Sequence, residues 1–291
     1  MGRTGRPKGR RGQRSFKSYP ETRNPMAIYF LCKSIVKDYL KTFCTEDKGI
    51  GGIEKRYLQV MNQDHLKEFA SNYYDNLRKA LMKAGDLMIE VTAVTRGRLL
   101  IGAGLPLETL GIFLEFPHGL PVIPGSSLKG VVRSVMDEGC LKDFKDFQEL
   151  IFGSVGEEGG SGRFIFVGGF PVNSNSKGKV LELDVLSPHY RNYYASKGAV
   201  GDSEKGIEAF EDDVKPVIYV VVGEGVTYKF LIVVKSMRDL KMRVICKFIK
   251  ELKRALEVHG IGYGISRGYG IFSVEEVKVY DDKGNLLYRT Y

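Results

Sequence analysis

The spacing of apolar residues divides the chain into a helical first part and a mixed second part. Apolar side chains recur at helical spacing over two stretches, residues 24–44 and 64–85. From residue 86 the period changes, because apolar and polar residues alternate over residues 87–93, as they do in a half-buried strand. The pattern therefore predicts a pair of helices followed by a region rich in strands.

Further short apolar runs bounded by turn residues predict the remaining strands. They lie at residues 99–101, 112–116, 164–167, 180–185, 217–222, 227–234, 271–280 and 286–288. A short helix is expected after Pro124–Gly125, and a longer one from Asp239 to His259. Strands and helices in this order predict an α+β fold with a ferredoxin-like unit.

Composition narrows the class of protein. Hydrophobic residues make up 43% and charged residues 27% of the chain, which is ordinary for a soluble globular protein. No apolar run reaches the roughly 18 residues of a membrane span, and the N-terminus lacks the apolar core of a secretory signal. The four cysteines include no CxxC pair, so we expect reduced thiols, no metal and no cofactor in a cytoplasmic protein.

Charge is concentrated at the N-terminus. The formal net charge is +9, and residues 1–23 hold eight Lys or Arg residues against one Glu, so this stretch alone carries +7. Such a segment is too polar to fold alone, and it can either contact phosphates or act as a solubilising tail. We therefore expect three parts: a basic flexible arm (residues 1–23), a helical segment packed on the core (24–85) and a ferredoxin-like core (86–291).

The first of two glycine-bearing segments, residues 119–133, places polar and basic groups at the start of the expected short helix. The candidate RNA-binding residues there are Ser126, Ser127, Lys129 and Arg133. Free backbone amides and two cations at a helix start can seat a phosphate, and Gly130 leaves room for another chain to approach. A capped helix that bears two solvated cations explains the same pattern equally well.

The second segment, residues 260–270, has five glycines in eleven residues, interleaved with tyrosines and an arginine. Its candidate RNA-binding residues are Gly262, Gly264, Arg267 and Gly268. A flexible backbone of this kind can lie against a sugar-phosphate chain, while Tyr263, Tyr269 and Arg267 can stack on bases. A P-loop or dinucleotide fingerprint is excluded because the expected loop follows a helix and leads into a strand. A plain glycine-rich connector is the alternative.

These two segments in this order resemble the RAMP superfamily of CRISPR proteins, whose members have a ferredoxin-like, RRM-related fold. Further motifs resemble the family of sixth subunits of the Cmr (type III-B) effector. Those motifs are Arg98–Gly104, Glu108, Gly119–Gly130, Asp184–Tyr194, Asp202, Lys215–Pro216 and the strand pair that ends at Phe230. The resemblance covers roughly residues 86–275.

The resemblance implies a non-catalytic subunit of a ribonucleoprotein that acts in antiviral defence. Such subunits bind the guide RNA and its paired single-stranded target RNA near the 3′ region of the guide. There they cap the row of backbone RAMP subunits and contact the first Cmr subunit. By the same resemblance, target cleavage belongs to the backbone subunits. No metal, cofactor or membrane is implied.

A metal-independent RAMP endoribonuclease that processes CRISPR RNA is the rival interpretation, since some RAMP proteins have this activity. RNA cleavage of that kind uses a general base and acid, commonly histidine. His189, next to Tyr190 and Arg191, is the better histidine candidate, and we assign these three residues to RNA binding rather than catalysis. Asp184 can be either a catalytic acid or a carboxylate that fixes a neighbouring loop. A scaffold without RNA contact is disfavoured by the cations in the two glycine-bearing segments.

Overall fold

The computed structural model describes residues 64–102, 112–115, 119–138, 145–154, 160–174, 180–186, 217–238 and 240–291. Several sequence predictions therefore lie outside the described residues, among them the basic arm at residues 1–23 and the helix at residues 24–44. The motif residues Glu108, Asp202 and Lys215–Pro216 lie outside them as well. The division of the chain into three parts stays a prediction.

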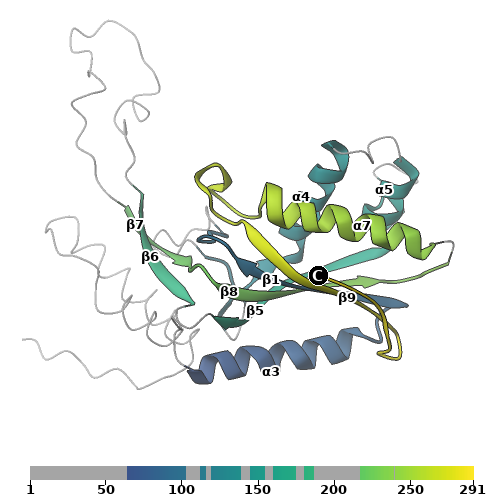
Figure 1. The fold of residues 1–291 in the computed structure, drawn as a ribbon, viewed down its shortest axis with the longest axis horizontal. Helices are drawn as coiled ribbons and strands as arrows, with labels where there is room; N and C mark the ends of the chain where they lie inside the picture. Colours follow the sequence, from purple (N-terminus) through teal and green to yellow (C-terminus); the bar gives the residue numbers. More distant parts are fainter. Residues whose placement is uncertain are drawn as a thin grey trace, which may run out of the picture.

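The described chain is organised around one six-stranded antiparallel sheet (Figure 1). Its strand order is β10-β9-β1-β8-β5-β4. The strands are β1 (Leu87–Thr95), β4 (Ile123–Pro124), β5 (Phe164–Ser174), β8 (Val226–Val234), β9 (Phe272–Asp281) and β10 (Leu286–Thr290). Two two-stranded antiparallel sheets lie beside it, β2 (Leu114–Glu115) with β3 (Leu120–Pro121), and β6 (Leu181–Leu186) with β7 (Val217–Val222).

The central strands and two helices form the predicted ferredoxin-like unit. Helix α4 (Gly125–Glu138) lies between β1 and β5 in the chain, and helix α7 (Met242–Arg254) lies between β8 and β9. The order β1-α4-β5-β8-α7-β9 is thus a βαββαβ unit, and its strands lie in the sheet as β9-β1-β8-β5. The predicted α+β, ferredoxin-like fold is confirmed.

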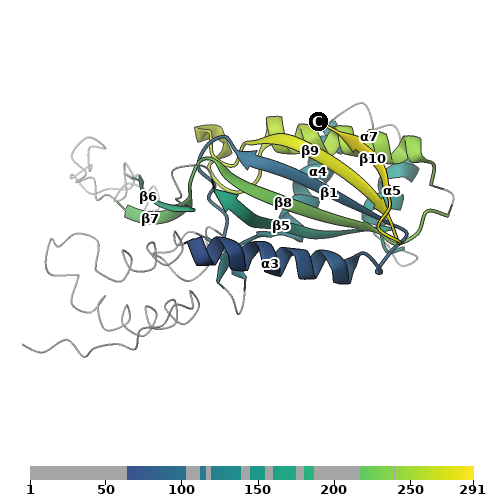
Figure 2. The ribbon, with the colours of Figure 1, turned by 60° about the horizontal axis from the view of Figure 1, so that its bottom comes forward.

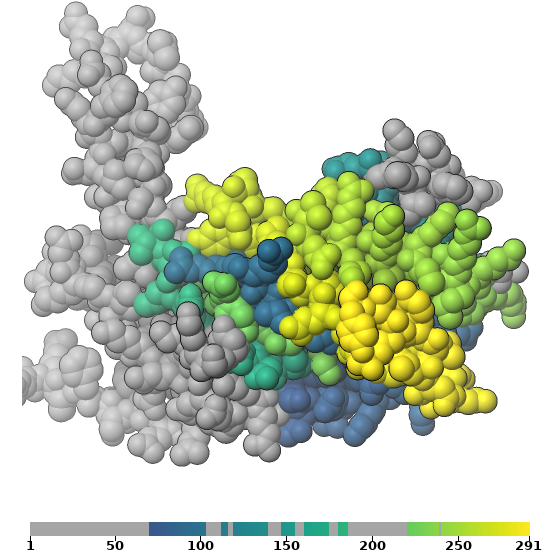
Figure 3. Space-filling view, in the orientation of Figure 1, coloured from purple at the N-terminus to yellow at the C-terminus, as the bar shows by residue number. Residues whose placement is uncertain are grey.

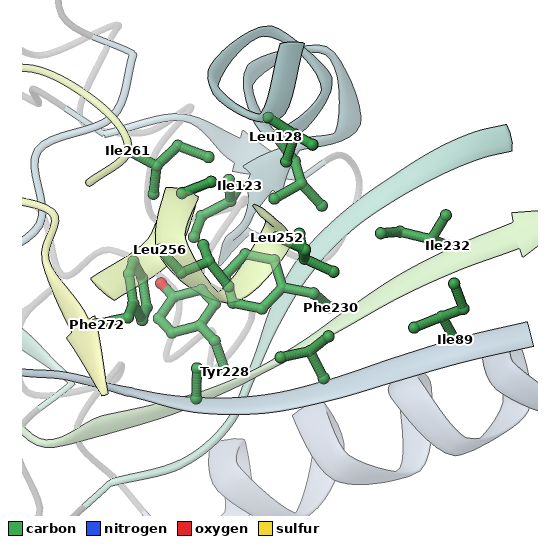
Figure 4. Packing of buried hydrophobic residues seen from close by; sticks show 14 of the residues in the cluster. Ile89, Ile123, Leu128, Tyr228, Phe230, Ile232, Leu252, Leu256, Ile261 and Phe272 are labelled. Carbon is green, nitrogen blue, oxygen red and sulfur yellow. The ribbon is translucent and has the colours of Figure 1, made fainter. Parts of the chain in front are cut away.

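Helices cover both faces of the sheet (Figures 1 and 2). Helices α4 and α7 lie on one face, where a core of aliphatic and aromatic residues joins them to the strands (Figure 4). In this core the ring of Phe272 meets Tyr228 and Phe230 edge-on, with ring centroids 5.9 and 5.5 Å apart. Helix α3 (Asp64–Leu81) covers the opposite face, as Figure 2 shows clearly.

A buried acid fastens α3 to the sheet. Glu90 of β1 is only 4% exposed, and its carboxylate accepts a hydrogen bond of 2.5 Å from the hydroxyl of Tyr74. The Arg78 Nε atom lies 2.9 Å from the same carboxylate, and its guanidinium lies over the Tyr280 ring. A buried carboxylate is stable only when it is paired in this way, so α3 is held in place by charge as well as by packing.

Close backbone contact explains why a glycine begins α4. A Cβ atom on Gly125 would lie 1.9 Å from the carbonyl oxygen of Phe166 in β5. The backbone at the start of the helix therefore packs directly against the backbone of β5, with no room for a side chain. Ser126 and Ser127 lie within the first turn of the helix, so neither is its N-cap residue.

Several boundaries differ from the prediction. The expected helix from Asp239 to His259 begins at Met242, and its last five residues, Ala255–His259, form a π-helix. The Gly260 amide donates to the Ala255 carbonyl over 2.9 Å, and this five-residue step widens the final turn. Helix α5 (Lys145–Phe152) was not predicted.

The expected strand at residues 99–101 is not a continuous strand. Its three residues pair with three different segments: Leu99 with Val222, Leu100 with Tyr263, and Ile101 with Ile112. No ladder can form when successive residues take different partners. Among the described residues, no helix has both the length and the apolar character needed to cross a membrane.

Candidate nucleic-acid interface

The segment from Arg98 to Leu100 joins two parts of the chain that are far apart in sequence. Leu99 exchanges two backbone hydrogen bonds of 2.9 Å with Val222 at the end of β7. On the other side, Leu100 accepts a 2.8 Å bond from the amide of Tyr263, and Arg98 accepts one from the amide of Gly270. The glycine-rich loop and strand β7 are therefore both hydrogen-bonded to the backbone of residues 98–100.

The glycine-rich loop, residues 260–270, has a defined conformation that depends on its glycines. All five of them adopt positive φ angles, between 70° and 107°, which other L-residues rarely adopt. The backbone of the loop also lies directly against the backbone of residues 98–100, since a Cβ atom on Gly262 would lie 2.5 Å from the Leu100 carbonyl oxygen. The flexible backbone inferred from the sequence is instead a shaped loop held by hydrogen bonds.

A charged network ties the loop to β6. The hydroxyl of Tyr269 donates to one carboxylate oxygen of Asp184, and the guanidinium of Arg98 lies 3.0 Å from the other. Arg98 also pairs with Glu182 over 3.4 Å. Burial alone would raise the pKa of Asp184. The bonds from Tyr269 and from the Val185 amide, together with the charge of Arg98, outweigh burial, so the pKa is lowered.

The outer surface of the loop combines an aromatic ring, an aliphatic side chain and a cation. Tyr263 is 59% exposed and Ile265 38% exposed. Arg267 is also exposed, at the end of the short 3₁₀ turn Ile265–Arg267. Tyr269 is half-buried and bound to Asp184. Of the two tyrosines expected to stack on bases, Tyr263 therefore presents the more accessible ring. Figure 3 shows the loop, in yellow-green, at the molecular surface.

The start of α4 offers a second set of polar groups. Ser126 is exposed and Ser127 half-buried. Lys129 is half-buried, and its Nζ donates a 2.9 Å hydrogen bond to the carbonyl of Phe152, the last residue of α5. Arg133, one turn later, is exposed. The two cations expected to act together are thus in different situations, because Lys129 already has a partner within the chain.

The two glycine-bearing segments meet through the core. Leu128 of α4 and Ile261 of the loop are both buried members of one cluster, which Figure 4 shows together with Ile123. The structure therefore brings the start of α4 and the base of the loop to the same region of the protein.

The third predicted group, His189, Tyr190 and Arg191, lies outside the described residues. It follows β6 in the chain, and β6 carries Asp184. Within the described residues, the side chain of His259 lies 4.0 Å from Glu138 and is 25% exposed. Among all the residues that the structure describes, no three His, Cys, Asp or Glu side chains are grouped closely enough to hold a metal.

Sequence reasoning missed the Arg98–Asp184–Tyr269 network as a unit, although it singled out each residue within a separate motif. A signal was available in the chemistry, since a carboxylate, an arginine and a tyrosine can pair. Nothing in their spacing shows that they meet.

Comparisons with known proteins agree with this architecture. The sequence profile of the RAMP superfamily matches residues 91–273. The chain is 28% identical over 263 residues to the CRISPR system CMR subunit Cmr6 of Saccharolobus solfataricus, which covers 88% of this chain and 82% of the relative. It is 26% identical over 260 residues to the Cmr6 subunit of Pyrococcus furiosus, covering 68% of this chain and 72% of that protein.

Solved structures show the same fold. A chain in the cryo-EM structure of the type III-B Cmr-beta bound to cognate target RNA matches with a TM-score of 0.65 and 22% identity. The match covers 90% of this chain and 95% of that chain. Because the superfamily profile spans more than half of the sequence, the chain belongs to the RAMP superfamily, and it is similar to the Cmr6 subunits of CRISPR systems.

Proposed function

We propose that this chain is a non-catalytic, RNA-binding structural subunit of a type III-B Cmr effector ribonucleoprotein. It binds the guide RNA and its target near the 3′ region of the guide and caps the row of backbone subunits. Its protein partners are the backbone RAMP subunit and the first Cmr subunit. The observation that carries the proposal is the similarity to a Cmr6 subunit over 88% of this chain and 82% of that relative.

The covered sheet limits where RNA can bind. RRM domains stack bases on aromatic residues of an open sheet face. Here α3 occupies that face, and Phe170 of β5 is buried against Tyr74 of α3. RNA contact is therefore assigned to the glycine-rich loop, with Tyr263 and Arg267 exposed, and to Arg133 on α4. An exposed ring beside a cation suits stacking on a base next to a phosphate.

The charged network argues against a catalytic acid at Asp184. A general acid must carry a proton near the working pH. The pKa of Asp184 lies below its ordinary value, so this carboxylate is ionised at neutral pH. Its bond to Tyr269 agrees with the alternative role, a carboxylate that fixes a neighbouring loop.

The test is to purify the tagged full chain from its native cells and to sequence the RNA that accompanies it. We expect short RNAs with a common repeat-derived 5′ tag and varied spacers, together with other Cmr proteins. Unprocessed repeat transcripts without those proteins would contradict the proposal and support the processing nuclease. Absence of any RNA would contradict the RNA-binding role.

A second measurement tests the absence of catalysis. The purified chain is incubated with repeat RNA without metal, and the products are resolved by length. We expect no specific products. Specific cleavage that disappears in a His189→Ala variant would show that the chain is a ribonuclease.

A further inference from the structure

Helix α7 carries a line of cations on its outer face. Six residues between 241 and 254 are exposed, and five of them are Lys or Arg. Four of these occupy positions spaced by four, three and four residues, which keeps them on one side of a helix: Arg243, Lys247, Lys250 and Arg254. We call these four residues the α7 basic stripe. At 1.5 Å per residue the stripe is about 16 Å long.

Within residues 241–254, which the structure describes, no acid is exposed. The one acid of the helix, Glu251, is 7% exposed and lies beneath the surface, 3.7 Å from Arg254. Lys253 is half-buried, donates to the carbonyl of Tyr291 and is not part of the stripe. Like charges three or four residues apart destabilise a helix, so binding of an anion along this face would be favourable.

The stripe lies in a strongly basic stretch of the body of the chain. Residues 1–23 account for +7 of the net charge of +9. Residues 241–254 hold six Lys or Arg residues and one Glu, a net charge of +5. The remaining residues of the chain therefore sum to −3. A surface charge placed only for solubility has no reason to gather on one helix.

The composition of the stripe favours a nucleic acid over a protein as its partner. The centres of protein interfaces are enriched in aromatic residues and depleted in lysine, and a few buried anchors supply most of the affinity. Exposed residues of α7 include no aromatic side chain, and Met242, just before the stripe, is the one apolar residue among them. Binding to a phosphate backbone needs only well-placed cations.

The position of the stripe connects it to the glycine-rich loop. Arg254 ends α7, the π-helix Ala255–His259 follows, and the loop begins at Gly260. Figures 1 and 3 show α7 lying along the surface with the loop at one end. A strand of RNA that contacts Arg267 can thus continue along the helix.

We propose that the α7 basic stripe is a second RNA-binding surface, which holds the phosphate backbone without reading sequence and extends the track that starts at the glycine-rich loop. The choice of RNA as the polyanion rests on the proposed function. The stripe itself is defined by the exposed cations of α7.

The test compares two full-length variants that lose the same charge. In the stripe variant, Arg243, Lys247, Lys250 and Arg254 are each changed to Gln, which has a helix propensity close to that of Lys and Arg. In the control variant, four exposed lysines outside α7 are changed to Gln: Lys79, Lys83, Lys235 and Lys283. The affinity of each for a labelled single-stranded oligouridine is measured by fluorescence anisotropy over a range of salt concentrations.

We expect the stripe variant to bind more weakly and to lose about 2.8 from the slope of log affinity against log salt, about 0.7 for each of four contacts. Between about 50 and 200 mM salt the wild type should then lose about fifty-fold more affinity than the stripe variant. The control variant should keep most of the wild-type slope. The N-terminal arm is present in all three proteins, so its contribution cancels.

Equal slopes for the stripe and control variants would overturn the proposal. So would a stripe variant that binds oligouridine as the wild type does but no longer co-purifies with other Cmr proteins, because the surface would then be a protein interface. A wild-type chain that fails to bind the probe at any salt concentration would also overturn it. The RNA that accompanies the wild-type chain from its native cells is measured separately, so failure of this proposal is distinguishable from failure of the proposed function.

Discussion

The hydroxyl of Tyr269 donates a hydrogen bond to the carboxylate of Asp184, which lies 85 residues earlier in the chain. This contact fixes the glycine-rich loop to β6. The segment that contains His189 follows β6 in the sequence, and Arg98 pairs with the same carboxylate. The glycine-rich loop and the motif that begins at Asp184 are therefore joined by a direct hydrogen bond, and changes at this contact should affect both the stability and the RNA affinity of the chain.

Changing Tyr269 to Phe should lower the free energy of unfolding by about 1–2 kcal/mol, because a hydrogen bond to a charged group is lost. The affinity for RNA should fall as well, since the loop loses its link to β6. Urea unfolding and anisotropy measure the two effects. Tyr263→Phe is the matched control, because that side chain is exposed and should change the stability by less than about 0.5 kcal/mol. Equal effects of the two changes on the free energy of unfolding would contradict the role of the contact.

The Asp184 carboxylate should make stability depend on pH. Its pKa in the folded chain lies below the ordinary 3.8, so its ionised form is stabilised by folding. This contribution is present above the ordinary value and is lost as pH falls through the lowered one. The difference in unfolding free energy between the wild type and Asp184→Asn should be constant above pH about 5 and should shrink below pH about 4.

Denaturant unfolding at several pH values checks this dependence. Asp282→Asn, at an exposed position in the β9–β10 turn, serves as the control. A wild-type advantage over Asp184→Asn that stays the same down to pH about 3 would show that the charge of Asp184 does not contribute.

Sequence periodicity predicted most of the sheet because β1 and β8 are long strands whose apolar residues are buried by helices. The order of strands and helices then left few topologies. The π-helix Ala255–His259, which ends the long C-terminal helix where the chain turns into the glycine-rich loop, was not predicted. Hydrophobic spacing does not distinguish a π turn from an α turn over five residues.

The site was less predictable than the fold, for physical reasons. Lys129 was expected to face a phosphate, but its partner is the carbonyl at the end of α5, a helix the sequence did not predict. Tyr269 and Asp184 were both noticed, yet their contact depends on the folded path of 85 residues. Residue type and local spacing indicate which groups can act. Tertiary structure decides which of them are already paired.

Two glycines of the α4 segment should respond in opposite ways to alanine. Gly125→Ala should destabilise the chain by about 3 kcal/mol or more, because the new Cβ atom would lie 1.9 Å from a backbone oxygen. Gly130→Ala should stabilise it by about 0.5–1 kcal/mol, because nothing lies within 4 Å and alanine favours the helix. Thermal and urea unfolding measure both. Destabilisation by Gly130→Ala in the isolated chain would contradict the open space at that position.

The cations of the two glycine-bearing segments should separate into structural and RNA-binding groups. Lys129→Ala should cost about 1 kcal/mol of stability, because the Phe152 carbonyl loses its donor. Arg133→Ala and Arg267→Ala should leave stability within about 0.5 kcal/mol, since both side chains are exposed.

RNA binding should show the reverse order. Each of the two arginine changes should reduce the slope of log affinity against log salt by about 0.7, whereas Lys129→Ala should have the smaller effect. A triple variant that combines Lys129→Ala, Arg133→Ala and Arg267→Ala measures their joint contribution to this slope. An unchanged salt slope in the triple variant would remove these residues from the proposed interface.

Loss of the buried acid beneath α3 should loosen the helix from the sheet. Glu90→Ala removes the partner of both Tyr74 and Arg78, and it leaves the arginine charge largely covered, with 23% of its side chain exposed. Breaking a buried pair in this way costs about 3 kcal/mol or more. Glu90→Gln keeps an acceptor for the hydroxyl of Tyr74 and should cost less. Hydrogen exchange at the amides of α3, measured beside global unfolding, separates local release from general loss of stability. If α3 stays as protected as in the wild type when Glu90 is replaced by Ala, packing alone holds it, and the covered sheet face does not depend on this charge.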